Sequence, residues 1–152
     1  MEVFRIAKEN YASALVASGT ANRWNLRGQQ VIYTGESRSL SSLELLVHKG
    51  VVSPSHNYRV MVISIADEDH LYKQIRLSEL PSHWRGFGAY SRLQKIGSDW
   101  ITRQESLVLK VPSAVIPLEY NYIINTEHPE FAQKVQLVRT EDYFWDARLL
   151  QK

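Results

Sequence analysis

Short runs of β-branched and bulky apolar residues recur along this chain, and they constrain its fold more than any other feature. Such runs are typical of β-strands. We predict strands or shorter extended pieces at 31–33, 58–65, 71–77, 107–111, 115–116, 122–124 and 135–139. The run that begins at Leu107 is expected to stop at Pro112, because proline cannot donate a hydrogen bond to a sheet.

Helical segments lie between these runs at irregular intervals. The clearest runs from Ser39 to Lys49, where Ser37 and Ser39 offer N-caps and Gly50 offers a C-terminal stop. The other predicted helices are 11–16, 90–102 with an interruption at 97–98, and a short helix with Pro129 at its first position. Segments 20–28 and 81–88 are predicted to be loops. The order of elements does not form a regular βαβ series, so we expect an α+β fold, a single mixed domain over residues 1–152.

Composition excludes several classes of protein. A chain of 152 residues can bury roughly 70% of its unfolded surface in one core. It has no cysteine, which excludes a disulfide scaffold, a thiolate nucleophile and a Cys-ligated metal. A net charge of +2 does not indicate binding to nucleic acid or to a membrane surface. No apolar run is long enough to span a bilayer, and no secretory signal is visible, so we expect a cytoplasmic protein.

The sequence also lacks the common catalytic motifs. There is no GxGxxG, GxxxxGK[ST], HExxH or GxSxG, so dinucleotide binding by a Rossmann crevice, P-loop phosphoryl transfer and zinc hydrolysis have no support. The five histidines show no metal-ligand spacing, and no metal site is expected.

Glu44 is the most informative residue of the helix that ends at Lys49. It shares a face with Leu40 at i−4 and Val47 at i+3, and Leu43 is placed on the same apolar face. A carboxylate that points inward costs several kcal/mol unless it is paired or hydrogen-bonded. Two interpretations remain open: a structural ion pair, or a catalytic or ligand-orienting carboxylate.

The loop 20–28 contains Arg23 beside Trp24 and Asn25. A guanidinium suits paired hydrogen bonds to phosphate or carboxylate. The alternative is a surface loop in which Trp24 packs into the core and Arg23 is solvated.

A third segment holds Ser113 between Pro112 and Pro117, where the prolines stiffen its backbone. Ser113 either presents its hydroxyl to a ligand or caps a turn. Asn121 and Asn125 are interpreted as residues that stabilise loops through their backbone contacts. Trp24, Trp84 and Trp100 are interpreted as core residues.

Taken together these segments resemble the RES domain family, which is named for a characteristic arginine, glutamate and serine. The resemblance covers nearly the whole chain in the family's order. The matching stretches are Val3-Phe4-Arg5-Ile6, Arg23-Trp24-Asn25 with Gly28, Val31-Ile32-Tyr33, Ser37 with Ser39-Leu40, Leu43-Glu44, Val47-His48, Leu80-Pro81, Trp84-Arg85, Gly97 with Trp100, Val111-Pro112-Ser113-Ala114, Glu119, Asn121, Asn125, His128-Pro129 with Phe131, and Asp146-Ala147-Arg148-Leu149.

The resemblance implies a fold similar to diphtheria-toxin-like ADP-ribosyltransferases and the activity of a bacterial toxin that consumes NAD+. Members cleave the nicotinamide–ribose bond and transfer ADP-ribose to phosphate, to water or to a protein. NAD+ would be the substrate, with no further cofactor. The implied partner is an Xre-type helix-turn-helix antitoxin, which itself binds the DNA, and the resemblance allows a toxin homodimer within that complex.

The residues fit these roles. Cleaving the nicotinamide–ribose bond develops positive charge on the ribose, which Glu44 would stabilise. Arg23 would hold the pyrophosphate, Tyr33 would stack on nicotinamide or hold the ribose, and Ser113 would hydrogen-bond the ribose or carboxamide. Asn25 joins this predicted NAD+-binding set. Two alternatives stay open: a protein ADP-ribosyltransferase with the same site, and an inactive RES domain that acts as an interaction module.

Overall fold

Seven strands form one mixed sheet in the computed structural model, which describes residues 1–49 and 57–150. Their order is β4-β5-β6-β2-β1-β3-β7, and every neighbouring pair is antiparallel except β4 and β5. The strands are β1 Glu2–Lys8, β2 Val31–Gly35, β3 Tyr58–Ile65, β4 Tyr72–Gln74, β5 Val108–Pro112, β6 Tyr120–Asn125 and β7 Val135–Tyr143. The helices are α1 Arg38–Lys49, α2 Tyr90–Arg103 and α3 Phe131–Lys134. Mixed α+β content is therefore confirmed.

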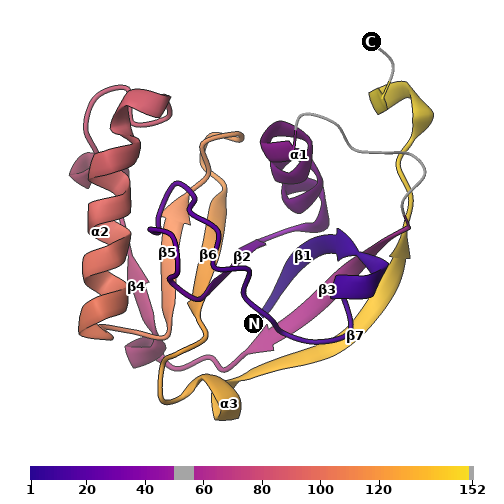
Figure 1. Ribbon diagram of the computed structural model, residues 1–152, viewed down its shortest axis with the longest axis horizontal. Helices are drawn as coiled ribbons and strands as arrows, with labels where there is room; N and C mark the ends of the chain where they lie inside the picture. The colour runs from indigo at the N-terminus through magenta and orange to yellow at the C-terminus, as the bar shows by residue number, and fades with distance from the viewer. Residues whose placement is uncertain (50–56, 151–152) are drawn as a thin grey trace.

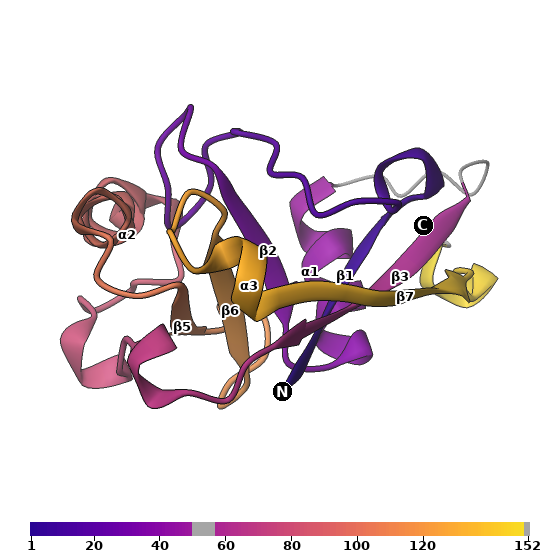
Figure 2. The same ribbon diagram turned by 90° about the horizontal axis from the view of Figure 1, so that it is seen from below.

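The sheet divides between β1 and β2, at its centre. These two strands pair at one position only, Phe4 with Gly35, whereas β1 pairs with β3 along its whole length. One half of the sheet contains β4, β5, β6 and β2, and the other contains β1, β3 and β7. The two views show the halves turned away from each other, with α1 over the division and α2 outside the first half (Figures 1 and 2). The open angle leaves room for a cavity beside α1.

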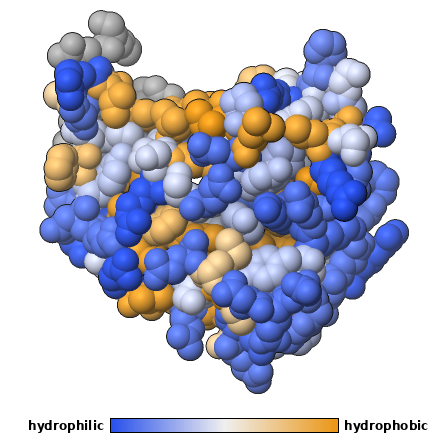
Figure 3. Space-filling model, turned by 180° about the vertical axis from the view of Figure 1, so that it is seen from behind, coloured by the Kyte–Doolittle hydropathy of each residue, from blue (hydrophilic) through white to orange (hydrophobic). Residues whose placement is uncertain are grey.

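Three apolar clusters hold these layers together. The largest lies between the two halves of the sheet and includes Ile32, Met61, Ile63 and Ile124, all buried. A second cluster packs α2 against β5 and β6, and a third packs α1 against β1 and β3. Seen from behind, the surface around this core is mostly hydrophilic, with apolar groups gathered along the upper edge and near the centre (Figure 3).

Helix α1 begins after Ser37, whose hydroxyl accepts a hydrogen bond from the Leu40 amide at 3.0 Å, so Ser37 is the N-cap. The predicted stop at Gly50 lies outside the described residues. The predicted apolar face is only partly right: Leu40 is fully buried, but Leu43 and Val47 are 36% and 62% exposed. Leu45 and Leu46, rather than Leu43 and Val47, pack with the core beside Leu40, and the neighbouring Glu44 and His48 line the cavity.

Helix α2 is continuous, and the predicted interruption near Gly97 is wrong. A glycine is required at position 97 because the backbone of Trp24 lies close to the helix there. A Cβ on residue 97 would lie 1.7 Å from the Trp24 carbonyl oxygen. The helix therefore rests directly on the backbone of the loop 20–28, which is irregular as predicted.

Three further local predictions differ from the structure. Residues 11–16 are not a helix; only a 3-10 turn at Glu9–Tyr11 precedes an irregular segment that covers the sheet. Residues 115–116 lie in a turn rather than an extended piece, and α3 begins at Phe131, after a turn that contains Pro129. Of the predicted strand 71–77, only Tyr72–Gln74 forms, at the sheet edge.

Candidate active site

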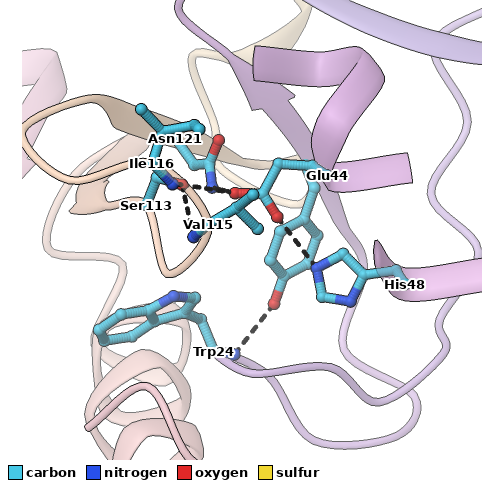
Figure 4. A network of polar contacts seen from close by, with 8 residues as sticks. Trp24, Glu44, His48, Ser113, Val115, Ile116 and Asn121 are labelled. Atoms are coloured by element: carbon cyan, nitrogen blue, oxygen red, sulfur yellow. Dashed lines mark hydrogen bonds and ion pairs between the residues drawn. The ribbon is translucent and has the colours of Figure 1, made fainter. Parts of the chain in front are cut away.

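The Glu44 carboxylate lies at the centre of a polar network contributed by three elements (Figure 4). Its Oε1 atom accepts hydrogen bonds from the Ser113 hydroxyl at 2.8 Å and from the Asn121 amide at 2.6 Å. Glu44 comes from α1, Ser113 follows β5 and Asn121 is near the start of β6. Only 16% of the Glu44 side chain is exposed. The glutamate is thus held in a fixed orientation by donors distant in sequence.

His48 contacts the other carboxylate oxygen. Its Nε2 atom lies 3.1 Å from Glu44 Oε2, one helical turn along α1. Burial alone would raise the pKa of the Glu44 carboxyl, but the hydrogen bonds from His48, Asn121 and Ser113 outweigh it, and this pKa lies below its ordinary value. Glu44 is therefore an anion at neutral pH. His48 was not predicted as a site residue, although its i,i+4 spacing from Glu44 indicates the contact.

Ser113 caps a turn, which is one of the two roles considered for it, and its hydroxyl contacts Glu44. Its Oγ atom accepts hydrogen bonds from the amides of Val115 and Ile116 at 3.0 and 3.1 Å, which caps the turn after β5. The same hydroxyl donates its proton to Glu44. Because Ser113 is almost fully buried and its one proton is committed to Glu44, it positions the carboxylate.

Asn121 does more than stabilise a loop, which corrects its interpretation from the sequence. Its side-chain amide donates to Glu44, so it belongs to the same network. Asn125 behaves as predicted: its Oδ1 atom accepts a hydrogen bond from the Glu127 amide at 3.0 Å, and the side chain is fully buried.

Tyr33 connects β2 to the loop 20–28. Its hydroxyl donates to Asn25 Oδ1 at 2.7 Å and accepts from the Trp24 amide at 3.0 Å. Burial raises the pKa of the Tyr33 hydroxyl, so the group stays protonated. Asn25 is fully buried, and its Nδ2 atom donates to the carbonyl oxygens of Thr20 and Leu26. Asn25 thus holds the Tyr33 hydroxyl and the backbone of the loop 20–28 in place through its hydrogen bonds.

Arg23 extends from this loop over two aromatic rings. Its guanidinium carbon lies 4.7 Å from the centre of the Tyr90 ring and 5.9 Å from that of Trp84, and Nη1 donates to the Trp84 carbonyl oxygen at 3.0 Å. Stacking on aromatic faces restricts an arginine at little cost to its other donors. Trp24, Trp84 and Trp100 are buried, as predicted for core residues.

These side chains surround a cavity of about 590 Å³, a volume within the range of small-molecule sites. Arg23, Tyr33, Glu44, His48 and Asn121 all line it, whereas Ser113 and Asn25 stand behind it. Its other wall is β1 and the irregular segment that follows. No cluster of three or more His, Asp or Glu side chains within residues 1–49 and 57–150 could hold a metal ion.

The fold has a counterpart among solved structures. The M. tuberculosis MbcT–MbcA toxin–antitoxin complex contains a chain that superposes with a TM-score of 0.71, covering 94% of this chain and 84% of that one at 16% identity. This likeness defines the fold. The sequence defines the family: the RES domain profile matches residues 2–146, and the chain belongs to the RES domain family.

Relatives of similar length are named as toxins. The chain is 32% identical to Toxin Res of Yersinia enterocolitica over 98% of its own length and 99% of the relative's. It is 30% identical to the Prs ADP-ribosylating toxin of a Sphingobium species over 88% of its own length and 83% of the relative's. Among the described residues, no helix has the length and apolar character needed to cross a membrane.

Proposed function

We propose that this protein is a toxin that depletes NAD+ by cleaving the bond between nicotinamide and ribose. The observation that carries the proposal is the distribution of charge in the cavity. Glu44 is the one carboxylate among its described lining residues, which also include three cationic residues, Arg5, Lys8 and Arg23. NAD+ carries the complementary pattern, with one positive ring and two negative phosphates. Membership of a family whose relatives are named toxins supports the same conclusion.

In this reaction the bond from the nicotinamide nitrogen to ribose C1′ breaks, and its electron pair leaves with nicotinamide. The leaving group becomes neutral and needs no proton, while positive charge develops on the ribose. An oriented carboxylate stabilises that charge, because its donors already fix it before reaction. Glu44 is suited to this role, since its lowered pKa keeps it ionised. The acceptor oxygen of water or phosphate then bonds to C1′ and releases a proton when water is used.

The remaining side chains would bind and orient the substrate. Arg23 offers planar donors to the pyrophosphate from its place over Tyr90. Tyr33 presents its ring to the cavity for nicotinamide or ribose. Ser113 and Asn121 act through Glu44 rather than through substrate contacts.

We propose an Xre-type helix-turn-helix antitoxin as the partner and the cytoplasm as the location of the reaction. Support for an antitoxin comes from the fold neighbour, which was solved in a toxin–antitoxin complex. A small neighbouring gene that encodes a helix-turn-helix protein would strengthen this assignment.

A second candidate is transfer of ADP-ribose to a protein. One relative is named a Prs ADP-ribosylating toxin, and the same Glu44 site would serve this reaction with a macromolecular acceptor. Label from NAD+ would then appear on protein. Phosphorolysis would instead yield ADP-ribose-1″-phosphate at a rate that rises with phosphate, and hydrolysis would yield plain ADP-ribose.

Induction of the chain without its antitoxin tests the proposal. We expect cellular NAD+ to fall before growth stops. Growth arrest at unchanged NAD+, with no labelled product from NAD+ in extracts, would refute NAD+ depletion.

A further inference from the structure

The loop 81–89, which leads into α2, is held in a defined shape beside the candidate active site. Trp84 is buried at its centre, and the Trp84 carbonyl oxygen accepts the hydrogen bond from Arg23 Nη1 at 3.0 Å. His83 has a φ of 59°, in the left-handed region that is unfavourable for a residue with a Cβ. Such backbone strain persists only where surrounding contacts impose it, and it is concentrated at binding and catalytic sites.

Phe87 is the exposed aromatic residue of this loop. Although it is 86% exposed, its 3-10 turn, Phe87–Ala89, continues directly into α2, so the helix holds the backbone beneath the ring. The Phe87 ring lies against that of Tyr90, with the two centres 5.3 Å apart and the planes inclined by 35°. A ring held in this way offers a large contact area and loses little conformational freedom when a second ring stacks on it.

Tyr90 connects Phe87 to the candidate active site. The guanidinium carbon of Arg23 lies 4.7 Å from the centre of the Tyr90 ring, and Arg23 lines the cavity. Phe87 and Tyr90 are not among the described residues that line it. The three side chains therefore form a row that begins at Arg23, on the edge of the cavity, and ends at the exposed ring of Phe87.

A dinucleotide matches the order of groups along this row. In the proposed function Glu44 faces the nicotinamide ribose and Arg23 binds the pyrophosphate. Adenine is joined to the pyrophosphate through a single ribose, so it must lie one sugar beyond Arg23. A purine ring stacks readily on an exposed aromatic side chain, because stacking needs only a ring face and no particular hydrogen-bond partner.

We propose that Phe87, supported by Tyr90, stacks against the adenine of the dinucleotide. The choice of adenine rests on the proposed function; the place of the stacking site rests on the contacts of Phe87, Tyr90 and Arg23. Phe87 is thus a binding residue that favours a dinucleotide over a mononucleotide, and it takes no part in breaking the bond to nicotinamide.

Calorimetry with the full chain tests the stacking, with ADP-ribose and nicotinamide mononucleotide as separate probes. ADP-ribose contains the adenine, whereas the mononucleotide contains only the half of NAD+ that would face Glu44. We expect Phe87→Ala to weaken ADP-ribose binding about fivefold to a hundredfold, the loss typical of one aromatic–base stack, and to leave the mononucleotide affinity unchanged. Phe87→Trp keeps an aromatic face and should bind ADP-ribose as well as wild type.

Phe144→Ala provides a matched control. Phe144 is 87% exposed and is not among the described residues that line the cavity, so its loss should change neither affinity. Proton NMR adds a readout that a purely structural role would not move. The adenine H2 and H8 signals of ADP-ribose should shift upfield on binding to wild type, and much less on binding to Phe87→Ala.

Three results would overturn the stacking site. They are wild-type protein that binds no ADP-ribose, Phe87→Ala protein that binds it normally, and equal losses for both probes, which would mean that Phe87 acts on Arg23 rather than on adenine. Nicotinamide release from NAD+ reports separately on the proposed function. Protein that binds ADP-ribose through Phe87 but releases no nicotinamide would keep the stacking site and refute cleavage, whereas release with an unaffected Phe87→Ala affinity would do the reverse.

Discussion

Replacing Glu44 with glutamine separates a catalytic carboxylate from a structural one. A glutamine side chain has the same shape, and its carbonyl oxygen can accept the hydrogen bonds from Ser113 and Asn121. Its NH₂ group then faces His48, whose Nε2 atom accepts a hydrogen bond in the neutral tautomer that carries its proton on Nδ1. Glu44→Gln should therefore fold with the network intact and lose only the negative charge.

The expected magnitudes follow from this geometry. Hydrogen bonds to a charged acceptor contribute about 1 kcal/mol more than neutral ones, so three of them lose about 3 kcal/mol. Burying a neutral amide in place of a carboxylate that is 16% exposed recovers part of this loss. We expect a net loss of about 1–2 kcal/mol in the free energy of unfolding at pH 7, or about 2–8 °C in Tm. Turnover should fall about 10²–10³-fold.

The stability difference should also depend on pH. Because the folded-state pKa of Glu44 is lowered, its ionisation stabilises the fold fully above the unfolded pKa of about 4.3. That contribution disappears as the pH falls through the folded pKa. The unfolding curves of wild type and Glu44→Gln should therefore converge in acid.

Nicotinamide release from NAD+, measured beside thermal melts, distinguishes the two roles. Glu127→Gln provides a matched control, since this exposed glutamate lies outside the cavity and should change neither quantity. A folded Glu44→Gln protein that keeps turnover within threefold of wild type would remove Glu44 from catalysis and leave it a structural role.

Two further changes test the loop 20–28. Arg23→Lys should weaken NAD+ binding about tenfold or more although the charge is kept, because lysine lacks paired donors. The control Arg27→Lys changes an exposed residue and should have little effect on this affinity. If calorimetry gives Arg23→Lys the same affinity as wild type, Arg23 is excluded from the pyrophosphate site. Gly97→Ala should lower the free energy of unfolding by about 2–3 kcal/mol, because its Cβ would meet the Trp24 carbonyl group. The control is Gly88→Ala, whose Cβ would have no atom within 4 Å. Equal urea midpoints for the two variants would show that α2 does not contact the loop 20–28 as described.

The sequence predicted most of the strands but not their partners. Runs such as Tyr58–Ile65 are rich in β-branched and bulky residues that favour a strand, so local composition was sufficient to predict it. Gly97 misled the prediction of α2, because its missing Cβ serves a contact with Trp24, far away in sequence. The exposure of Leu43 and Val47 could not be anticipated either, since it depends on where the cavity lies. Strand β1 was not predicted, and residues 3–6 were singled out only as part of the family resemblance.

The candidate site was predictable in part for a similar reason. Glu44 stood out because a carboxylate on an apolar face needs partners, and His48 could have been found by the same helical spacing. That Ser113 and Asn121 are those partners depends on the register of β5 and β6, which pair Val111 with Asn121. No local pattern encodes that register. The family resemblance grouped these residues without giving the contacts.

The order of the chain sets when the site can first exist. Glu44 is made early, but Ser113 and Asn121 follow it by 69 and 77 residues. During synthesis α1 therefore emerges from the ribosome long before β5 and β6, and its carboxylate has none of its strand-borne donors. A nascent chain that ends before β6 also lacks the strand that pairs with β2 along its whole length. If the proposed function holds, activity should be withheld until nearly the whole chain has been made, and an antitoxin could bind the chain before its site is complete.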